Sequence, residues 1–227
     1  MHEKKQTEKK VNKKLLFWVM MVFGIILITI GTYGIAKKYA SSHKKDILPN
    51  NKTVIAASTS EPSETEPSPE DVSQYNVPAD QPRSIIISSL GISGLIQKVG
   101  LTTDNAVAVP TNIYYAGWYT NSVKPGDTGL SIIDGHVSGV YHDAIFKNLY
   151  KVNIKDIIEI EFGDGSIKKF QVVDRKVLPK DQSSDYLFTK NPTIESQLNL
   201  ITCTGKFDKD TATFDKRVVI ISTLRNY

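Results

Sequence analysis

Three side chains in the second half of the sequence could together perform nucleophilic chemistry. Cys203 is the chain's one cysteine and lies near the end of the apolar run 198–204. His136 stands between glycines just after the apolar run 130–133, and Arg217 opens the last apolar run. A cysteine nucleophile needs a partner that moves protons and a donor that stabilises the oxyanion. An imidazole that titrates near neutral pH can supply the first, and a permanently charged guanidinium the second.

Each of these residues also has a simpler interpretation. Cys203 can be a small buried side chain without reactivity, His136 a loop histidine that only hydrogen-bonds, and Arg217 a solvated cation at a strand end. Their combination favours chemistry. The segment 204–216 can connect two antiparallel strands, which would bring Cys203 and Arg217 side by side.

Two neighbouring residues qualify this hypothesis. Asp134, two residues before His136, could raise the pKa of the histidine or simply face water. His142 is a rival base, but it precedes a predicted short helix, a position better suited to capping than to catalysis.

Other clusters point to structure rather than to a cofactor. No group of His, Cys or carboxylate residues has metal-ligand spacing, so neither a catalytic metal nor a cofactor is predicted. Asp208, Asp210 and Asp215 share one loop but lack a full calcium-loop pattern and are interpreted as turn residues. Four aromatic residues could edge a peptide groove or form ordinary packing: Tyr114, Tyr115, Trp118 and Tyr119.

The elements that must position these residues are mostly strands. Short β-rich runs separated by Gly, Pro, Asn and Asp occupy residues 84–90, 94–101, 129–137, 156–162, 166–178, 198–204 and 216–224. Only residues 142–151 and 183–191 have the pattern of short helices. The region 83–227 therefore predicts one all-β domain, a barrel or a sandwich with one or two short helices.

The N-terminal part has a different character. Residues 15–36 are 22 residues without a charged side chain, about 33 Å as a helix, which is long enough to cross a bilayer core. A cleaved signal peptide is the alternative, although its apolar region is usually only about 7–15 residues. Either interpretation exports the rest of the chain, and the lysines before the helix favour a cytoplasmic N-terminus for residues 1–14.

Charge divides the chain into three regions. Residues 1–45 carry a net charge of +8, residues 46–82 of −6 and residues 83–227 of +2. The Ser-, Pro- and Glu-rich segment 37–82 cannot bury enough apolar surface to fold and is predicted to be a disordered linker. Because the folded part is nearly neutral and has no basic stripe, no nucleic acid is expected as a partner.

Two segments resemble the sortase family. LNLITCTGKFDKDTATFDKRVVIIS (198–222) is similar to the family's strand ending in Leu-x-Thr-Cys, followed by a loop and an arginine. GLSIIDGHVSG (129–139) resembles the family's Gly-His strand end. The Thr-Cys-x-Gly-x-Phe-Asp pattern and the Ala-Ile-Phe-x-x-Leu after the histidine are closest to class F, and less close to class D or E. The resemblance covers residues 83–227 and implies an eight-stranded β-barrel with a groove leading to Cys203, which Thr202, beside the nucleophile, would line.

The resemblance also implies a function. Cys203 would attack the threonine carbonyl of an LPxTG-like sorting signal, His136 would move the protons and Arg217 would stabilise the oxyanion. The thioacyl enzyme would then pass the surface protein to an amino group of a lipid-linked peptidoglycan precursor in a Gram-positive cell wall. A monomeric single-pass membrane protein with an extracellular catalytic domain is expected. The alternatives are a thiol endopeptidase that only hydrolyses and a non-catalytic tethered surface-binding domain.

Overall fold

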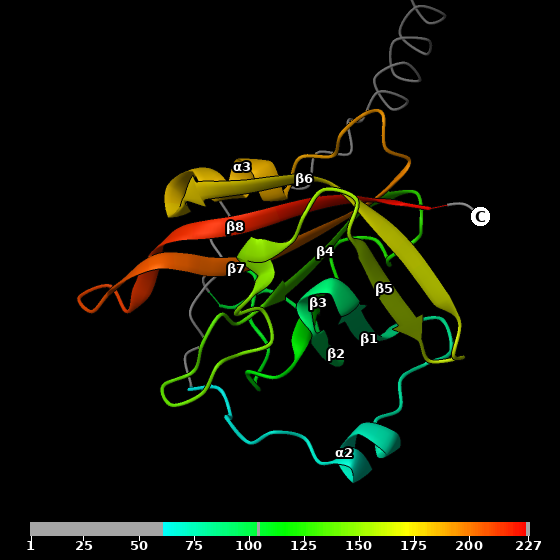
Figure 1. Cartoon of the computed structure of the whole chain (residues 1–227), viewed down its shortest axis with the longest axis horizontal. Helices are drawn as coiled ribbons and strands as arrows, with labels where there is room; N and C mark the ends of the chain where they lie inside the picture. The colour runs from blue at the N-terminus through cyan, green and yellow to red at the C-terminus, as the bar shows by residue number, and fades with distance from the viewer. Residues whose placement is uncertain (1–60, 104, 226–227) are drawn as a thin grey trace, which may run out of the picture. The chain divides into compact units, whose positions relative to one another are not determined.

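The protein is represented by a computed structural model that describes residues 61–103 and 105–225, shown in Figure 1. The strands are β1 (Pro82–Ile87), β2 (Ile92–Val99), β3 (Ala116–Tyr119), β4 (Gly129–Gly135), β5 (Ile157–Phe162), β6 (Ile167–Pro179), β7 (Ser196–Asp208) and β8 (Thr213–Leu224). The α-helices are α2 (Pro69–Gln74) and α3 (Ser183–Leu187), and single 3₁₀ turns occupy Ser88–Leu90, Leu149–Lys151 and Lys180–Gln182.

These strands close into a barrel in the order β1-β2-β3-β4-β7-β8-β6-β5. Most neighbours are antiparallel, but β2 pairs with β3 and β4 with β7 in parallel. Parallel neighbours need a long crossover, and here the crossovers are the loop 100–115 and the whole stretch 136–195. The predicted eight-stranded all-β barrel with few short helices is confirmed.

Buried side chains form two clusters on opposite faces of the same strands. Ile133, Leu200 and Val218 belong to the larger cluster, which fills the barrel. The residues next to them in sequence, Ile132, Ile201 and Val219, belong to a smaller cluster on the outer face. This second cluster, here called the outer cluster, also contains Val99 at the end of β2, Val107 from the loop that follows and Leu187 from α3. The split follows from the two-residue period of a strand.

Seven of the strands correspond to β-rich runs of the sequence, but β3 was not predicted. It has four residues, all buried, and holds two of the four aromatic candidates, Trp118 and Tyr119. Both are packing residues, as one of the two interpretations required, while Tyr114 and Tyr115 are half-buried. A short strand buried on both faces lacks the alternating pattern that would reveal it.

The predicted helix over 142–151 is wrong apart from its last turn, the 3₁₀ turn Leu149–Lys151. Its backbone is used for tertiary pairing instead. The N–H of Ile145 donates to the carbonyl of Ile113 and the N–H of Phe146 donates to that of His136. Donors engaged in this way cannot bond to carbonyls four residues back, so the helical pattern is overridden.

The structure also differs from the expected disorder of the linker where residues 61–82 are described. Helix α2 begins with a capping box, in which the hydroxyl of Ser68 and the carboxylate of Asp71 satisfy each other's backbone N–H groups. Further on, the Tyr75 hydroxyl donates to the carbonyl of Ile96 in β2 at 2.6 Å, and Arg83 donates to the carbonyls of Val72 and Tyr75. This part of the linker runs along the barrel through hydrogen bonds, which composition alone does not reveal (Figure 1).

The predicted membrane anchor at 15–36, the tail 1–14 and linker residues 37–60 lie outside the described residues. In the part of the chain that the structure covers, no helix is long and apolar enough to span a membrane.

Replacing Tyr75 tests whether the described part of the linker is bound to the barrel. Tyr75→Phe removes the hydroxyl that bonds to Ile96 and should lower the free energy of unfolding in urea by about 1 kcal/mol. Tyr141→Phe is the matched control, because Tyr141 is 86% exposed and should unfold like the wild type. Equal stability of the two variants would contradict the docking of this segment.

Candidate active site

Cys203 and Arg217 are direct partners across the β7–β8 pair. The antiparallel register places Cys203 opposite Arg217, between the Thr202–Val218 and Thr204–Lys216 pairs. The predicted hairpin arrangement is therefore confirmed. Figure 1 shows the two strands continuing beyond the barrel as a long hairpin. Cys203 lies two residues after Ile201 and Arg217 two residues before Val219, and both of these belong to the outer cluster. The thiol and the guanidinium therefore project from the same outer face of the sheet.

The guanidinium of Arg217 is held by its own strand. Its Nη1 donates to the carbonyls of Phe214 and Lys216, at 2.8 and 2.9 Å, and its Nη2 donates to the Thr213 hydroxyl at 3.1 Å. The residue is only 3% exposed. A guanidinium has more N–H donors than these three bonds use, so a buried positive charge with donors for a further acceptor lies beside Cys203.

His136 follows directly after β4, the parallel neighbour of β7. Its Nε2 lies 2.9 Å from the carbonyl oxygen of Pro110. A carbonyl can only accept, so Nε2 carries the proton and Nδ1 is the basic nitrogen of the neutral ring. The ring is thus oriented by a backbone group from the loop 100–115, a contact that sequence reasoning had no signal to find.

Thr202 has a different position from the one expected. It is 4% exposed and its hydroxyl donates to the carbonyl of Gly135 at 2.8 Å. Adjacent strand residues point to opposite faces, so Thr202 points away from the face that carries Cys203. It therefore does not line a groove beside the thiol; it ties β7 to the last residue of β4, which precedes His136.

The surroundings favour the uncharged forms of the thiol and the imidazole. Burial raises the pKa of Cys203; the Arg217 charge opposes this shift, Asp134 adds to it and Lys180 opposes it. Burial also lowers the pKa of His136, against the effect of its bond to Pro110. At neutral pH the resting pair is consequently a thiol and a neutral imidazole.

Asp134 neither faces water nor contacts a cation. It is 2% exposed, and its two carboxyl oxygens accept no hydrogen bond from another described residue. Its neighbours are Gly117 of β3 and Ile201 of β7, and any side chain at Gly117 would collide with the carboxyl group. Burial raises the pKa of Asp134 well above its ordinary value. Of the two roles expected, facing water is wrong, and the pKa of His136 is not raised.

The remaining candidates do not join this site. His142 is exposed, and its backbone N–H bonds to the carboxylate of Glu64. Asp208 and Asp215 accept backbone N–H groups within the β7–β8 hairpin, as turn residues do. Within residues 61–103 and 105–225, no three His, Cys, Asp or Glu side chains gather where a metal ion could bind.

A family model described as "Sortase domain" matches residues 85–225. The chain belongs to the sortase family. Solved sortases share the fold at low identity. Sortase C2 of pilus island 1 from Group B Streptococcus is 19% identical, with a TM-score of 0.52 over 85% of this chain and 95% of that one. Sortase A from Corynebacterium diphtheriae is 19% identical, with a TM-score of 0.50 over 86% and 82%. No curated protein matches the chain.

The unpaired carboxyl of Asp134 should make this sortase's stability depend on pH. A group whose pKa is raised by folding binds more protons in the folded state, so unfolding free energy falls as pH rises. The fall should begin near the unfolded pKa of about 4 and reach at most about 1.4 kcal/mol per pH unit. Asp134→Asn should remove this fall in urea unfolding curves measured from pH 4 to 8, whereas the exposed control Asp181→Asn should keep it. Parallel curves for wild type and Asp134→Asn would refute the assignment.

The charge of Arg217 should control the reactivity of Cys203. Iodoacetamide alkylates the thiolate, so the pH at which the alkylation rate is half its maximum reports the pKa of Cys203. This midpoint should lie above the usual pKa of a cysteine, because burial raises the pKa of Cys203. Arg217→Gln should move the midpoint further up, while Arg217→Lys, which keeps the charge, should move it less. Labelling is followed by mass spectrometry of the intact chain, which has one thiol. An unchanged midpoint in Arg217→Gln would show that the charge of Arg217 does not affect the ionisation of Cys203.

Proposed function

We propose that this sortase is a cysteine transpeptidase that cleaves an LPxTG-like sorting signal between Thr and Gly and transfers the acyl group to an amine. The observation that carries the proposal is the direct β7–β8 pairing of Cys203 with Arg217, next to the strand end that bears His136. A nucleophile, a titratable base and a buried cation come from the neighbouring strands β7, β4 and β8, with the base just after the end of β4. This is the set that acyl transfer through a thioester requires.

In the first half-reaction, Nδ1 of His136 takes the thiol proton and the sulfur of Cys203 attacks the threonine carbonyl carbon. The carbonyl oxygen becomes an oxyanion, which the free N–H donors of Arg217 stabilise. The intermediate collapses when the C–N bond to glycine breaks, and His136 returns the proton to the departing amine. A thioacyl enzyme and a peptide that begins with glycine result.

In the second half-reaction, an amine attacks the thioester carbonyl and loses a proton to His136. The C–S bond then breaks, an amide forms and the proton returns to the sulfur of Cys203. Because the resting pair is thiol and imidazole, the enzyme keeps its nucleophile protonated until substrate arrives. Exclusion of water by the bound peptide would strengthen the Arg217–oxyanion contact.

The finer assignments follow the sequence resemblance. The proposed class is F, and the proposed substrates are surface proteins with a C-terminal sorting signal. The proposed acceptor is the amine of a lipid-linked peptidoglycan precursor. Residues 15–36 would anchor the enzyme as a single-pass membrane protein with its N-terminus in the cytoplasm, which places the catalytic domain outside the cell.

The test is mass spectrometry of the full-length chain in mild detergent, incubated with an LPxTG peptide library and a panel of amines. We expect a thioacyl adduct on Cys203 and an amide-joined product. Cys203→Ala should abolish both, and His136→Ala should reduce turnover by roughly 10²–10⁴-fold, the usual range for general acid–base catalysis. Arg217→Lys, which keeps the charge but loses the planar fork, should retain more activity than Arg217→Gln.

Two other outcomes would replace the proposal. Cleaved acid product without any amide product would identify a thiol endopeptidase. A folded Cys203 that forms no adduct with any peptide and resists alkylation would identify a non-catalytic binding domain.

A further inference from the structure

Residues 63–65 bond to the loop 100–115 around an isolated β-bridge. Ser63 forms a parallel bridge with Asn112: its N–H donates to the carbonyl of Thr111 at 2.8 Å, and its carbonyl accepts the N–H of Ile113 at 3.0 Å. The side-chain amide of Asn112 also donates to the carbonyl of Thr65 at 2.9 Å. Backbone pairing of this kind needs no apolar side chains, so it is compatible with the polar composition of the segment.

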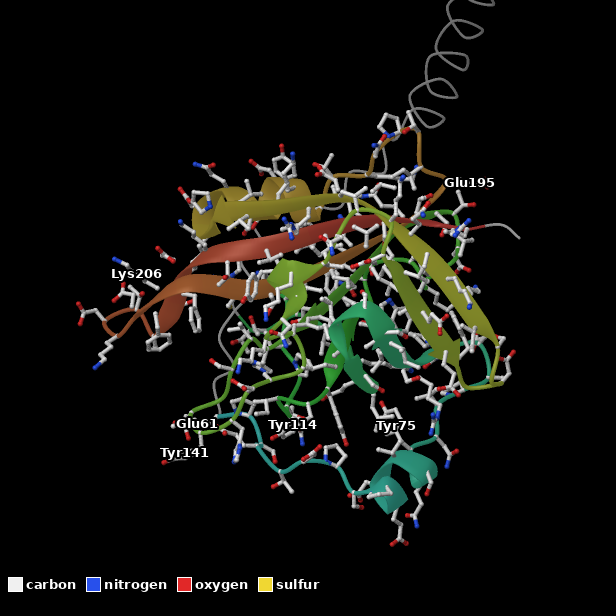
Figure 2. The ribbon with its side chains drawn as sticks, in the orientation of Figure 1. Glu61, Tyr75, Tyr114, Tyr141, Glu195 and Lys206 are labelled. Atoms are coloured by element: carbon white, nitrogen blue, oxygen red, sulfur yellow. The ribbon has the colours of Figure 1, made fainter. Side chains whose placement is uncertain are left out.

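The next residue, Glu64, reaches a different loop. Its carboxylate accepts the backbone N–H groups of Val140, Tyr141 and His142, the last two at 3.0 and 2.9 Å. Three successive N–H groups aimed at one point form an anion-binding nest. Gly139 completes it, because a Cβ at this position would collide with the carboxyl group of Glu64. Figure 2 labels Tyr141 of this loop, and Glu61 at the start of the described segment.

The loop that forms the nest has little packing of its own. Val140 is 66% and Tyr141 86% exposed, so both side chains project into solvent. The loop is closed by the bond from the Gly139 N–H to the His142 carbonyl and by a bridge between Ser138 and Asp143. No buried core holds this loop in place. Its N–H groups at 140–142 instead find their hydrogen-bond acceptor in the carboxylate of Glu64.

The two loops that residues 63 and 64 join are the ones that hold His136. The loop that pairs with Ser63 contains Pro110, whose carbonyl accepts Nε2 of the imidazole. The loop that contacts Glu64 starts at His136 itself and returns through Phe146, whose N–H donates to the His136 carbonyl at 3.0 Å. The loops also bond to each other, from the Ile145 N–H to the Ile113 carbonyl. Ser63 and Glu64 add a second link between these two loops, because each of the two residues bonds to one of them.

Glu64 is held as an anion in this position. Burial alone would raise its pKa, but the N–H groups of Val140, Tyr141 and His142, followed by the charge of His142, outweigh it and lower the pKa. None of the hydrogen bonds recorded for residues 61–75 reaches Cys203 or Arg217. Within the described chain, Ser63, Glu64 and Thr65 instead bond to the two loops around His136.

We propose that Glu64 is a positioning residue for His136: by joining the nest at 140–142 to the strand pairing at 111–113, it fixes the loop that carries the imidazole. The kinetic part rests on the transpeptidase function proposed above. The effect on the imidazole does not depend on that function, because it concerns only how firmly the ring is held against Pro110.

The contact can be broken from both sides with little change to the barrel. Glu64→Gln keeps the shape but removes the charge and replaces one of the two acceptor oxygens by an NH2 group, which cannot accept from the N–H groups of the nest. Gly139→Ala displaces the carboxyl group of Glu64, which is the end of a flexible side chain and can move away. Glu66→Gln is the matched control, because Glu66 is an exposed acid two residues further on. Glu64→Asp tests rescue by a shorter carboxylate.

Two measurements on the full-length chain are required. The first is kcat and KM with the peptide and amine that the wild type uses. We expect Glu64→Gln and Gly139→Ala each to lower kcat roughly tenfold with little change in KM, as for a misplaced catalytic group. Glu64→Asp should recover part of the loss, Glu66→Gln should match the wild type, and the double variant should be no worse than either single variant.

The second measurement is the NMR titration of the His136 ring, assigned with His136→Gln and His142→Gln. Loss of a nearby negative charge alone would lower the pKa of a histidine. If Glu64 instead positions the ring, its loss exposes the ring to water and relieves the burial that lowers the His136 pKa, so the titration should move upward. The other charged or titratable groups near this site are unchanged in the variants: Asp134 on β4, Lys180 in the turn after β6, Cys203 on β7 and Arg217 on β8.

The outcomes separate the two proposals. If no peptide is turned over but the His136 titration moves upward in Glu64→Gln and Gly139→Ala, the positioning role stands and the proposed reaction fails. If the wild type is an active transpeptidase and both variants match it in kcat and in the His136 titration, the positioning role is overturned. A downward shift in Glu64→Gln, absent in Gly139→Ala, would also overturn it, because charge alone would then explain the effect.

Discussion

The active site depends on the register of the β7–β8 pair. The ladder runs without a shift from Gln197–Thr223 to Thr204–Lys216, and its irregularity comes only afterwards, before Phe207. Because side chains alternate between faces, a slip of one residue would turn Cys203 into the barrel and leave Arg217 opposite a different neighbour. The buried hydroxyls of Thr202 and Ser222, which donate to the carbonyls of Gly135 and Leu198, oppose such a slip, so contacts remote from the chemistry fix the thiol–guanidinium pair.

The same alternation explains why the site is poorly hydrated. Asp134, Cys203 and Arg217 continue the rows of the outer cluster, so they leave the sheet next to buried apolar side chains. Burial then has three separate effects: it raises the pKa of the thiol, lowers that of the imidazole and raises that of Asp134. Apolar surroundings lower the local dielectric constant and so strengthen the effect of the Arg217 charge on the thiol. The same burial is unfavourable for Asp134, whose carboxyl group has no hydrogen-bond partner among the described residues.

Much of this arrangement could be predicted from local sequence. Seven strands have apolar runs of the right length, and the spacing from Cys203 to Arg217 predicts a hairpin. The failures have a common cause, because each depends on partners distant in sequence. Strand β3 is visible only through its neighbours, the helix expected at 142–151 is replaced by bonds to Ile113 and His136, and the orientation of His136 depends on a main-chain carbonyl. Backbone groups carry no residue-specific signal, so no pattern could reveal Pro110.

The described part of the linker makes the same point about disorder. A low apolar content predicts that residues 61–68 cannot form a core, and they do not form one; most of them are exposed. The backbone pairing of Ser63 and the binding of the Glu64 carboxylate in the nest need no core of their own. Their partners are already ordered by the folding of the barrel domain, so only the segment itself loses conformational entropy when it binds. Composition thus describes what a segment can do alone. Whether it is ordered in the protein depends on whether a folded neighbour presents unsatisfied backbone donors, and here the loop after His136 presents three.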